Sequence, residues 1–175
     1  YQLSTAQAET CVSEALKAGF RHIDSAEGYN NEDGTGRGIK GSGVKREDIY
    51  ITTKLFPGYE QWGSPEKDYK QTVENLKNQL QTLQLEYVDL YLIHAPFSST
   101  RLDQWRALVD LQKEGLTRHI GVSNYNQDRI QEIIDAGLPT PETNQIEFHP
   151  LCLQKELTAY MKEHNIEPVG YSSLA

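Results

Sequence analysis

Four residues whose side chains can move protons or hold charge lie in the first hundred positions of the chain: Asp24, Tyr29, Lys54 and His94. A phenol such as that of Tyr29 is a weak acid near neutral pH, but a nearby ammonium stabilises the phenolate and eases release of the proton. Lys54 could supply that charge, with Asp24 paired to it. A neutral His94 could donate a hydrogen bond that orients and polarises a carbonyl oxygen. Together the four side chains predict proton chemistry at a carbonyl group.

Each of these residues lies at or just beyond the end of a predicted strand. The strands in question are residues 20–23, 49–55 and 87–93. The third is a nearly continuous apolar run, which is typical of a parallel strand covered on both faces. In a barrel of parallel strands the carboxyl ends form the catalytic face, where residues from several strands converge. We therefore expect the four side chains to meet at one end of a sheet.

Helical patterns alternate with strands along the rest of the chain. Ser64 followed by Pro65 predicts where one helix begins. A helix over residues 30–43 is expected to be short and soft because of its glycines. The other predicted helices cover residues 4–19, 64–83, 102–115, 130–137 and 153–161, and the remaining strands cover residues 118–122, 144–148 and 168–171. Such alternation requires a parallel sheet with right-handed crossovers, either an open doubly wound sheet or a barrel.

A phosphate-binding fingerprint would distinguish these two architectures. A doubly wound nucleotide-binding sheet carries Gly-x-Gly-x-x-Gly directly between a strand and a helix. Here that spacing is found at Gly36, Gly38 and Gly41, inside the weak helical segment. We interpret the match as chance. The sequence therefore favours an α/β fold of the (β/α)8 TIM-barrel type.

Length, charge and cysteine content fit one domain, residues 1–175, that handles a small molecule. The formal net charge of −8 disfavours nucleic acid or an anionic membrane as the main partner. No stretch approaches the roughly 20 apolar residues of a membrane span, and we expect no signal peptide. Cys11 and Cys152 are far apart in sequence and are expected to be reduced. We therefore expect a soluble, cytoplasmic protein.

In the order and spacing of its motifs the chain resembles the aldo-keto reductase family. The motifs are residues 19–26 with Tyr29, then residues 51–54, 92–94, 121–124, 144–145 and 170–172. The resemblance implies a (β/α)8 barrel that passes hydride from NADPH to the carbonyl of an aldehyde or ketone, without a metal. NADH remains open as the cofactor, because the preference for NADPH rests on the resemblance alone. A monomer is implied for the complete protein.

The resemblance also implies a role for each candidate site residue. Tyr29 would be the general acid, Lys54 and Asp24 its tuning pair, and His94 would orient the carbonyl. The cofactor-binding residues would be Ser123, Asn124 and Gln145 at the nicotinamide carboxamide, Tyr171 stacked on the ring, and Ser172 and Leu174 along the pyrophosphate. Paired donors and acceptors suit an amide, and an aromatic face suits a flat ring.

The chain departs from the family pattern in three places. Ala95 follows His94 where many members carry tryptophan, and Phe56 replaces another common pocket tryptophan. These changes predict an altered substrate pocket that is wider at Ala95. The chain also lacks the first and eighth barrel strands of the pattern, so we expect a fragment of a longer barrel.

Two other interpretations of the chain stay open. The protein could be a cofactor-binding regulatory or scaffold protein that turns over slowly, or an inactive fragment of a longer reductase. Separately, His22 could form a metal centre with Asp24 and His94, but Lys54 would compete for the carboxylate. A hydrogen-bonded histidine in the barrel interior is the simpler interpretation of His22.

Overall fold

Six strands form one parallel sheet in the computed structural model, which describes residues 1–174. The strands are β1 (His22–Asp24), β2 (Tyr50–Leu55), β3 (Val88–Ile93), β4 (Thr117–Ser123), β5 (Thr143–Glu147) and β6 (Glu167–Tyr171). They pair in chain order, each parallel to the next. This order confirms the barrel-type α/β fold over a doubly wound sheet, since a doubly wound sheet reverses its strand order. The chain forms six strands of such a barrel.

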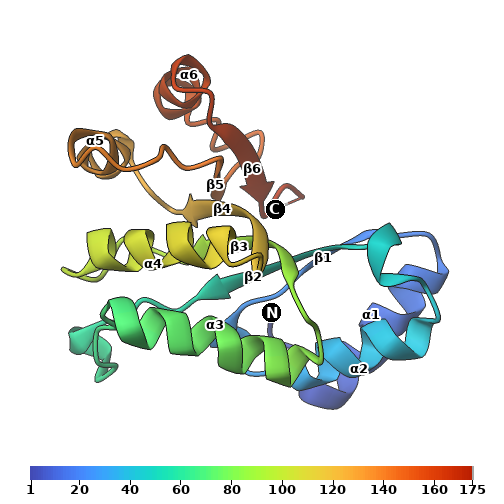
Figure 1. The fold of residues 1–175 in the computed structure, drawn as a ribbon. Helices are drawn as coiled ribbons and strands as arrows, with labels where there is room; N and C mark the ends of the chain where they lie inside the picture. Colours follow the sequence, from blue (N-terminus) through green and yellow to red (C-terminus); the bar gives the residue numbers. More distant parts are fainter. Residues whose placement is uncertain (175) are drawn as a thin grey trace.

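Helix α1 precedes β1, the other five helices connect successive strands, and the helices lie on the outer side of the sheet. They are α1 (Thr5–Lys17), α2 (Glu32–Ser42), α3 (Tyr69–Leu83), α4 (Arg101–Lys113), α5 (Gln127–Asp135) and α6 (Lys155–Glu163). Figure 1 shows them following the sheet from α1 and α2 at the bottom to α5 and α6 at the top. Short 3-10 turns are η1 (Glu27–Tyr29), η2 (Arg46–Asp48) and η3 (Glu60–Trp62). No helix among residues 1–174 is long and apolar enough to cross a membrane.

The predicted start of α3 at Ser64 is wrong. The helix begins at Tyr69, because the Asp68 carboxylate accepts the Gln71 backbone N–H at 2.8 Å and the Gln71 side chain accepts the Asp68 N–H at 2.9 Å. This reciprocal capping box satisfies two otherwise free donors. Ser64 instead forms an antiparallel bridge with Tyr59. The segment between β2 and α3 is therefore longer than expected.

Glycines in α2 allow it to pack closely between α1 and α3. A Cβ added to Gly34 or Gly38 would overlap the backbone of α1, and one added to Gly36 would overlap the backbone at the end of α3. Gly41, by contrast, has room for a methyl group. The sequence suggested only that glycine weakens this helix. The structure shows that these glycines also let α2 approach its neighbours closely. They lie inside a helix and not at a turn from a strand into a helix.

We expect Gly38→Ala to lower the free energy of unfolding by about 2 kcal/mol or more, because the added methyl would lie 2.6 Å from the Glu9 carbonyl oxygen. Gly41→Ala is the matched control on the same helix. It should be neutral or stabilise by up to about 1 kcal/mol, because alanine favours helix. Urea unfolding of both variants measures the difference, and equal effects would contradict the close-packing role.

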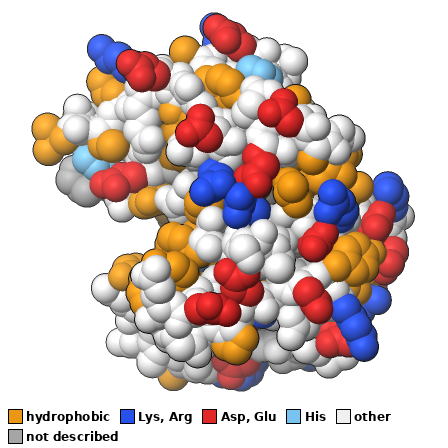
Figure 2. Space-filling model, turned by 90° about the vertical axis from the view of Figure 1, so that its left-hand side faces the viewer, with side chains coloured by type: hydrophobic (Ala, Val, Ile, Leu, Met, Phe, Trp, Pro, Cys, Tyr) orange, Lys and Arg blue, Asp and Glu red, His pale blue; other side chains and the backbone are white. Residues whose placement is uncertain are grey.

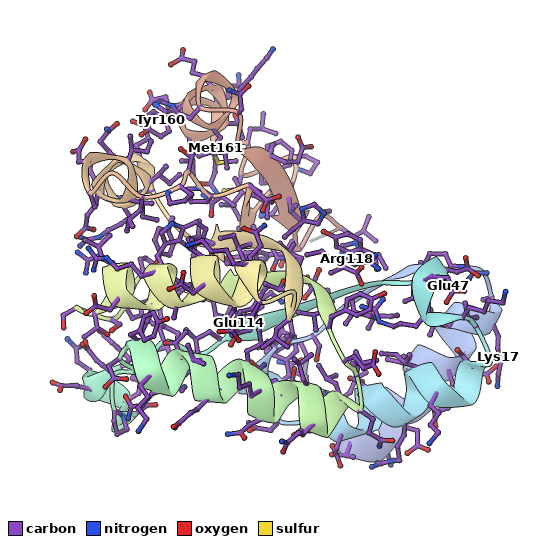
Figure 3. All side chains as sticks on the ribbon, in the orientation of Figure 1. Lys17, Glu47, Glu114, Arg118, Tyr160 and Met161 are labelled. Atoms are coloured by element: carbon purple, nitrogen blue, oxygen red, sulfur yellow. The ribbon has the colours of Figure 1, made fainter. Side chains whose placement is uncertain are left out.

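The apolar core lies between the sheet and its helices. Trp105 of α4 and Tyr91 of β3 are fully buried there, and the Trp105 indole donates to the Pro139 carbonyl at 2.8 Å. Met161, labelled on α6 in Figure 3, is also buried, and its sulfur accepts from the Asn144 amide at 3.5 Å. Figure 2 shows a hollow on one side of the molecule, at about mid-height.

Candidate active site

Lys54 lies at the centre of the site and is fully buried at the end of β2. Its ammonium donates to the Asp24 carboxylate at the end of β1, to the Ser25 carbonyl at 3.0 Å and to the Tyr29 hydroxyl at 3.2 Å. The parallel pairing of β1 with β2 brings the two strand ends to one edge of the sheet. All three hydrogens of the ammonium are thus directed at oxygen atoms. The structure therefore brings Asp24, Tyr29 and Lys54 together, as the sequence predicted.

His94 completes the cluster from the end of β3. Its backbone N–H donates to the Leu55 carbonyl at 3.0 Å, and its ring packs edge-on against the Tyr29 ring with centroids 5.8 Å apart. Burial, aided by the charge of Lys54, lowers the pKa of His94 from 6.5 to about 4. His94 is therefore a neutral imidazole at neutral pH, the state in which it is expected from the sequence to donate a hydrogen bond.

The lowered pKa of His94 predicts a pH dependence of stability. Between about pH 4 and 6.5 the unfolded chain binds a proton at His94 that the folded chain does not, so the unfolding free energy should rise with pH across this window. His94→Gln should remove that part of the slope. Urea unfolding of both proteins at several pH values measures the difference. Equal slopes, or an NMR titration of the His94 ring centred near pH 6.5, would contradict the lowered pKa.

Three polar residues in or directly after β4 and β5 extend the site. The Gln145 side-chain amide donates to the second carboxylate oxygen of Asp24 at 2.7 Å. The Ser123 hydroxyl donates to the backbone carbonyl of Gln145 at 2.8 Å. The Asn124 amide donates to the His94 carbonyl at 3.0 Å and to the Ser123 hydroxyl at 3.1 Å. One hydrogen-bonded network therefore joins the predicted cofactor residues to the predicted catalytic residues.

Tyr171 closes this network at the end of β6. Its hydroxyl donates to the Asn124 side-chain oxygen at 2.8 Å, and 37% of the residue is exposed. Ser172 has a left-handed backbone with φ of 54°, and Leu174 is fully exposed. In the part of the chain that the structure describes, neither Ser172 nor Leu174 joins the network through its side chain. The structure thus brings eight of the ten predicted site residues together.

The polar and aromatic groups at the ends of β5 and β6 suit a nicotinamide. In residues 1–174 no group donates to the side-chain oxygen of Gln145, so this atom is free to accept an amide N–H. The Tyr171 ring is held by its hydroxyl and remains partly exposed, which suits stacking against a flat ring. Both amide hydrogens of Asn124 already have acceptors. Asn124 therefore orients its neighbours, while Gln145 offers the free acceptor.

The histidines outside the cluster have ordinary partners. His22 shares a hydrogen bond of 2.8 Å with the Thr52 hydroxyl, and His119 shares one of 2.6 Å with Glu142. Within residues 1–174 no group of three or more His, Cys, Asp or Glu side chains is placed to hold a metal ion. The metal-centre interpretation of His22 therefore has no support in this geometry.

Sequence reasoning missed Glu27, which lies in the turn that carries Tyr29. Its carboxylate contacts Phe56, Lys67 and Asn75, which come from the end of β2, the following loop and α3. The sequence around a single glutamate in a loop does not indicate which distant residues it will contact. A hint was its position two residues before Tyr29, in the same short turn.

The family of the chain follows from comparison with known proteins. A model of the Aldo/keto reductase family matches residues 1–175. The chain belongs to this family. Among aldo/keto reductases, a structure from Brucella melitensis has a TM-score of 0.89 and 42% identity, over 99% of this chain and 66% of that one. The Bombyx mori aldo-keto reductase in complex with NADP has a TM-score of 0.87 and 34% identity, over 98% and 58%.

Two bacterial reductases are similar to the chain in sequence. Methylglyoxal reductase DkgA of Escherichia coli (strain K12) is 40% identical over 177 residues, which is 100% of this chain and 61% of that protein. Glyoxal reductase of Bacillus subtilis (strain 168) is 42% identical over 168 residues, which is 96% of this chain and 58% of that protein. The chain thus spans about three fifths of the length of these relatives.

Proposed function

We propose that the protein containing this chain reduces the carbonyl group of small aldehydes or ketones with a nicotinamide cofactor. The observation that carries the proposal is the contact of the buried Lys54 ammonium with both the Tyr29 hydroxyl, at 3.2 Å, and the Asp24 carboxylate. This arrangement suits a phenol that gives up a proton. Membership of the aldo/keto reductase family supports the same chemistry.

When bound, the cofactor would supply a hydride to the carbonyl carbon. Tyr29 would donate its proton to the carbonyl oxygen as negative charge develops there. Lys54 would stabilise the phenolate that remains, and Asp24 would keep the lysine charged in its buried position. Neutral His94 would donate a hydrogen bond that orients the carbonyl oxygen. Each side chain thus acts on the proton or on the oxygen that receives it.

Gln145 would bind the nicotinamide carboxamide, Ser123 and Asn124 would orient Gln145 through their hydrogen bonds, and Tyr171 would stack on the ring. The link from Gln145 to Asp24 supports this placement, because it sets the carboxamide site beside the proton donor. Ser172 and Leu174 would lie along the pyrophosphate. We propose NADPH as the cofactor, supported by the related structure in complex with NADP.

Small aldehydes are the substrate class that we propose. The relatives named methylglyoxal reductase and glyoxal reductase support a short dicarbonyl substrate. Ala95, the small residue directly after His94, is buried, and we expect its short side chain to leave room for the substrate.

The proposal is tested by mixing the complete protein with NADPH and a panel of aldehydes and ketones, and following cofactor absorbance. We expect cofactor oxidation that depends on the carbonyl compound and is fastest with small dicarbonyls. Tight cofactor binding without turnover of any compound would contradict the proposed reaction and favour a regulatory or scaffold role.

A further inference from the structure

The turn that carries Tyr29 is anchored by a carboxylate of its own. Glu27 accepts the Phe56 backbone N–H at 2.7 Å, the Lys67 ammonium at 3.0 Å and the Asn75 amide at 3.0 Å. Its side chain is 30% exposed. Three donors from separate parts of the chain thus converge on one carboxylate beside the candidate active site.

Glu27 and Tyr29 are the first and last residues of the single turn η1. The Tyr29 N–H donates to the Ala26 carbonyl at 3.1 Å, and the Asn30 N–H donates to the Glu27 carbonyl at 3.1 Å. A turn this short transmits any shift of its first residue to its last. The position of the Tyr29 phenol therefore depends on where the Glu27 carboxylate is held.

The anchor reaches the strand that carries Lys54. Phe56 follows Lys54 by two residues, and both of its backbone groups are bound: its N–H donates to Glu27, and its carbonyl accepts from Lys67 at 2.6 Å. The Lys67 ammonium also lies 5.7 Å from the centre of the Phe56 ring. The Glu27–Lys67 pair thus fixes the η1 turn against the end of β2.

The anchor continues into α3 through Asn75. The Asn75 amide donates to Glu27 and, at 2.9 Å, to the Gln79 side chain, which in turn donates to the Lys54 carbonyl at 3.3 Å. A second route therefore leads from Glu27 to the backbone of Lys54. The Tyr29 turn and the lysine strand are held to the same helix.

We propose that Glu27 is a positioning residue that sets the Tyr29 hydroxyl against the Lys54 ammonium; its effect on turnover rests on the carbonyl reduction proposed above. Tyr29 and Lys54 are joined directly by a hydrogen bond of 3.2 Å and by a cation–π contact of 5.0 Å, and the Glu27 anchor adds an independent constraint on their separation. Displacing a reacting group by about 1 Å can cost up to about 100-fold in rate. The Glu27 carboxylate contacts neither Tyr171 nor the residues proposed for the carboxamide site, Ser123, Asn124 and Gln145.

The test compares three variants of the complete protein. Glu27→Ala removes the anchor, and Glu27→Gln keeps an oxygen that can accept the Phe56 N–H. Glu132→Ala is the matched control, because Glu132 is 31% exposed and accepts two hydrogen bonds of 2.7 Å from Arg101, away from Tyr29. Steady-state kinetics gives kcat and the KM for NADPH, and hydrogen exchange reports the backbone amides of Tyr29 and Phe56.

For Glu27→Ala we expect kcat to fall about tenfold or more, with the KM for NADPH within about twofold and faster exchange at the Tyr29 and Phe56 amides. Glu27→Gln should recover most of kcat, and Glu132→Ala should match the unchanged protein. Unaltered kcat, an equal loss in the control, or a loss confined to the KM for NADPH would overturn the proposal.

The exchange measurement separates this proposal from the proposed function. If the unchanged protein reduces no carbonyl compound, the proposed function fails on its own. The anchor is then judged by exchange alone: faster exchange at Tyr29 in Glu27→Ala, but not in Glu132→Ala, supports it. Unchanged exchange at Tyr29 overturns it.

Discussion

Replacing Tyr29 by phenylalanine in the complete protein should lower kcat for aldehyde reduction by about three orders of magnitude while leaving NADPH affinity within about twofold. The hydroxyl is needed only as charge develops on the substrate oxygen, so its loss affects the transition state and not cofactor binding. The ring remains to pack against His94. Turnover assays and fluorescence titration with NADPH measure the two quantities separately.

Tyr160→Phe is the control for this substitution, because it removes a hydroxyl of α6 that donates to Gln131 of α5 at 2.9 Å, outside the hydrogen-bonded network of Tyr29. It should leave both quantities unchanged. If reduction survives in Tyr29→Phe, or if cofactor affinity and turnover fall together, then Tyr29 is not the proton donor.

Lys54→Met should lower kcat by at least about 100-fold while leaving the protein folded. Methionine fills a similar volume without charge, and removing one partner of an ion pair is strongly destabilising only where it leaves the other charge buried. Asp24 is 35% exposed and still accepts from Gln145, so water and that amide can satisfy it. Turnover assays and urea unfolding of the variant measure the two effects.

Asp24→Asn provides the contrasting variant for Lys54→Met. It leaves the fully buried Lys54 ammonium without its counter-charge, which should lower the unfolding free energy by about 3 kcal/mol. The two variants should therefore both lose turnover but differ in stability. If Lys54→Met were the less stable of the two, or retained turnover, the charge assigned to Lys54 would be wrong.

Strand ends were the part of the structure that the sequence predicted well. The apolar run before His94 and the β-branched run that includes Lys54 both proved to be parallel strands. Because parallel strands place their carboxyl ends at one edge, recognising the strands was enough to bring the four reactive side chains together. The helix start at Ser64 failed because a serine followed by proline competes with Asp68, whose carboxylate forms a complete capping box.

Contacts between distant segments could not be predicted from the sequence. Gln145 and Asp24 are 121 positions apart, yet one hydrogen bond joins them. Their motifs suggested separate roles, one in cofactor binding and one in proton chemistry. Likewise the fit of Gly38 against α1 and the partners of Glu27 depend on how helices settle on the sheet, which local periodicity does not encode.

Transfer of deuterium tests the central claim most directly. The complete protein is given NADPH that carries deuterium at the transferable position of its nicotinamide ring, together with methylglyoxal, and the alcohol product is analysed by mass spectrometry and NMR. Hydride reduction at the Tyr29–Lys54 site predicts one deuterium bound to the former carbonyl carbon, and about a thousandfold less of this product from Tyr29→Phe under the same conditions. Cofactor oxidation that leaves the product without deuterium, or equal labelling by the variant, would contradict it.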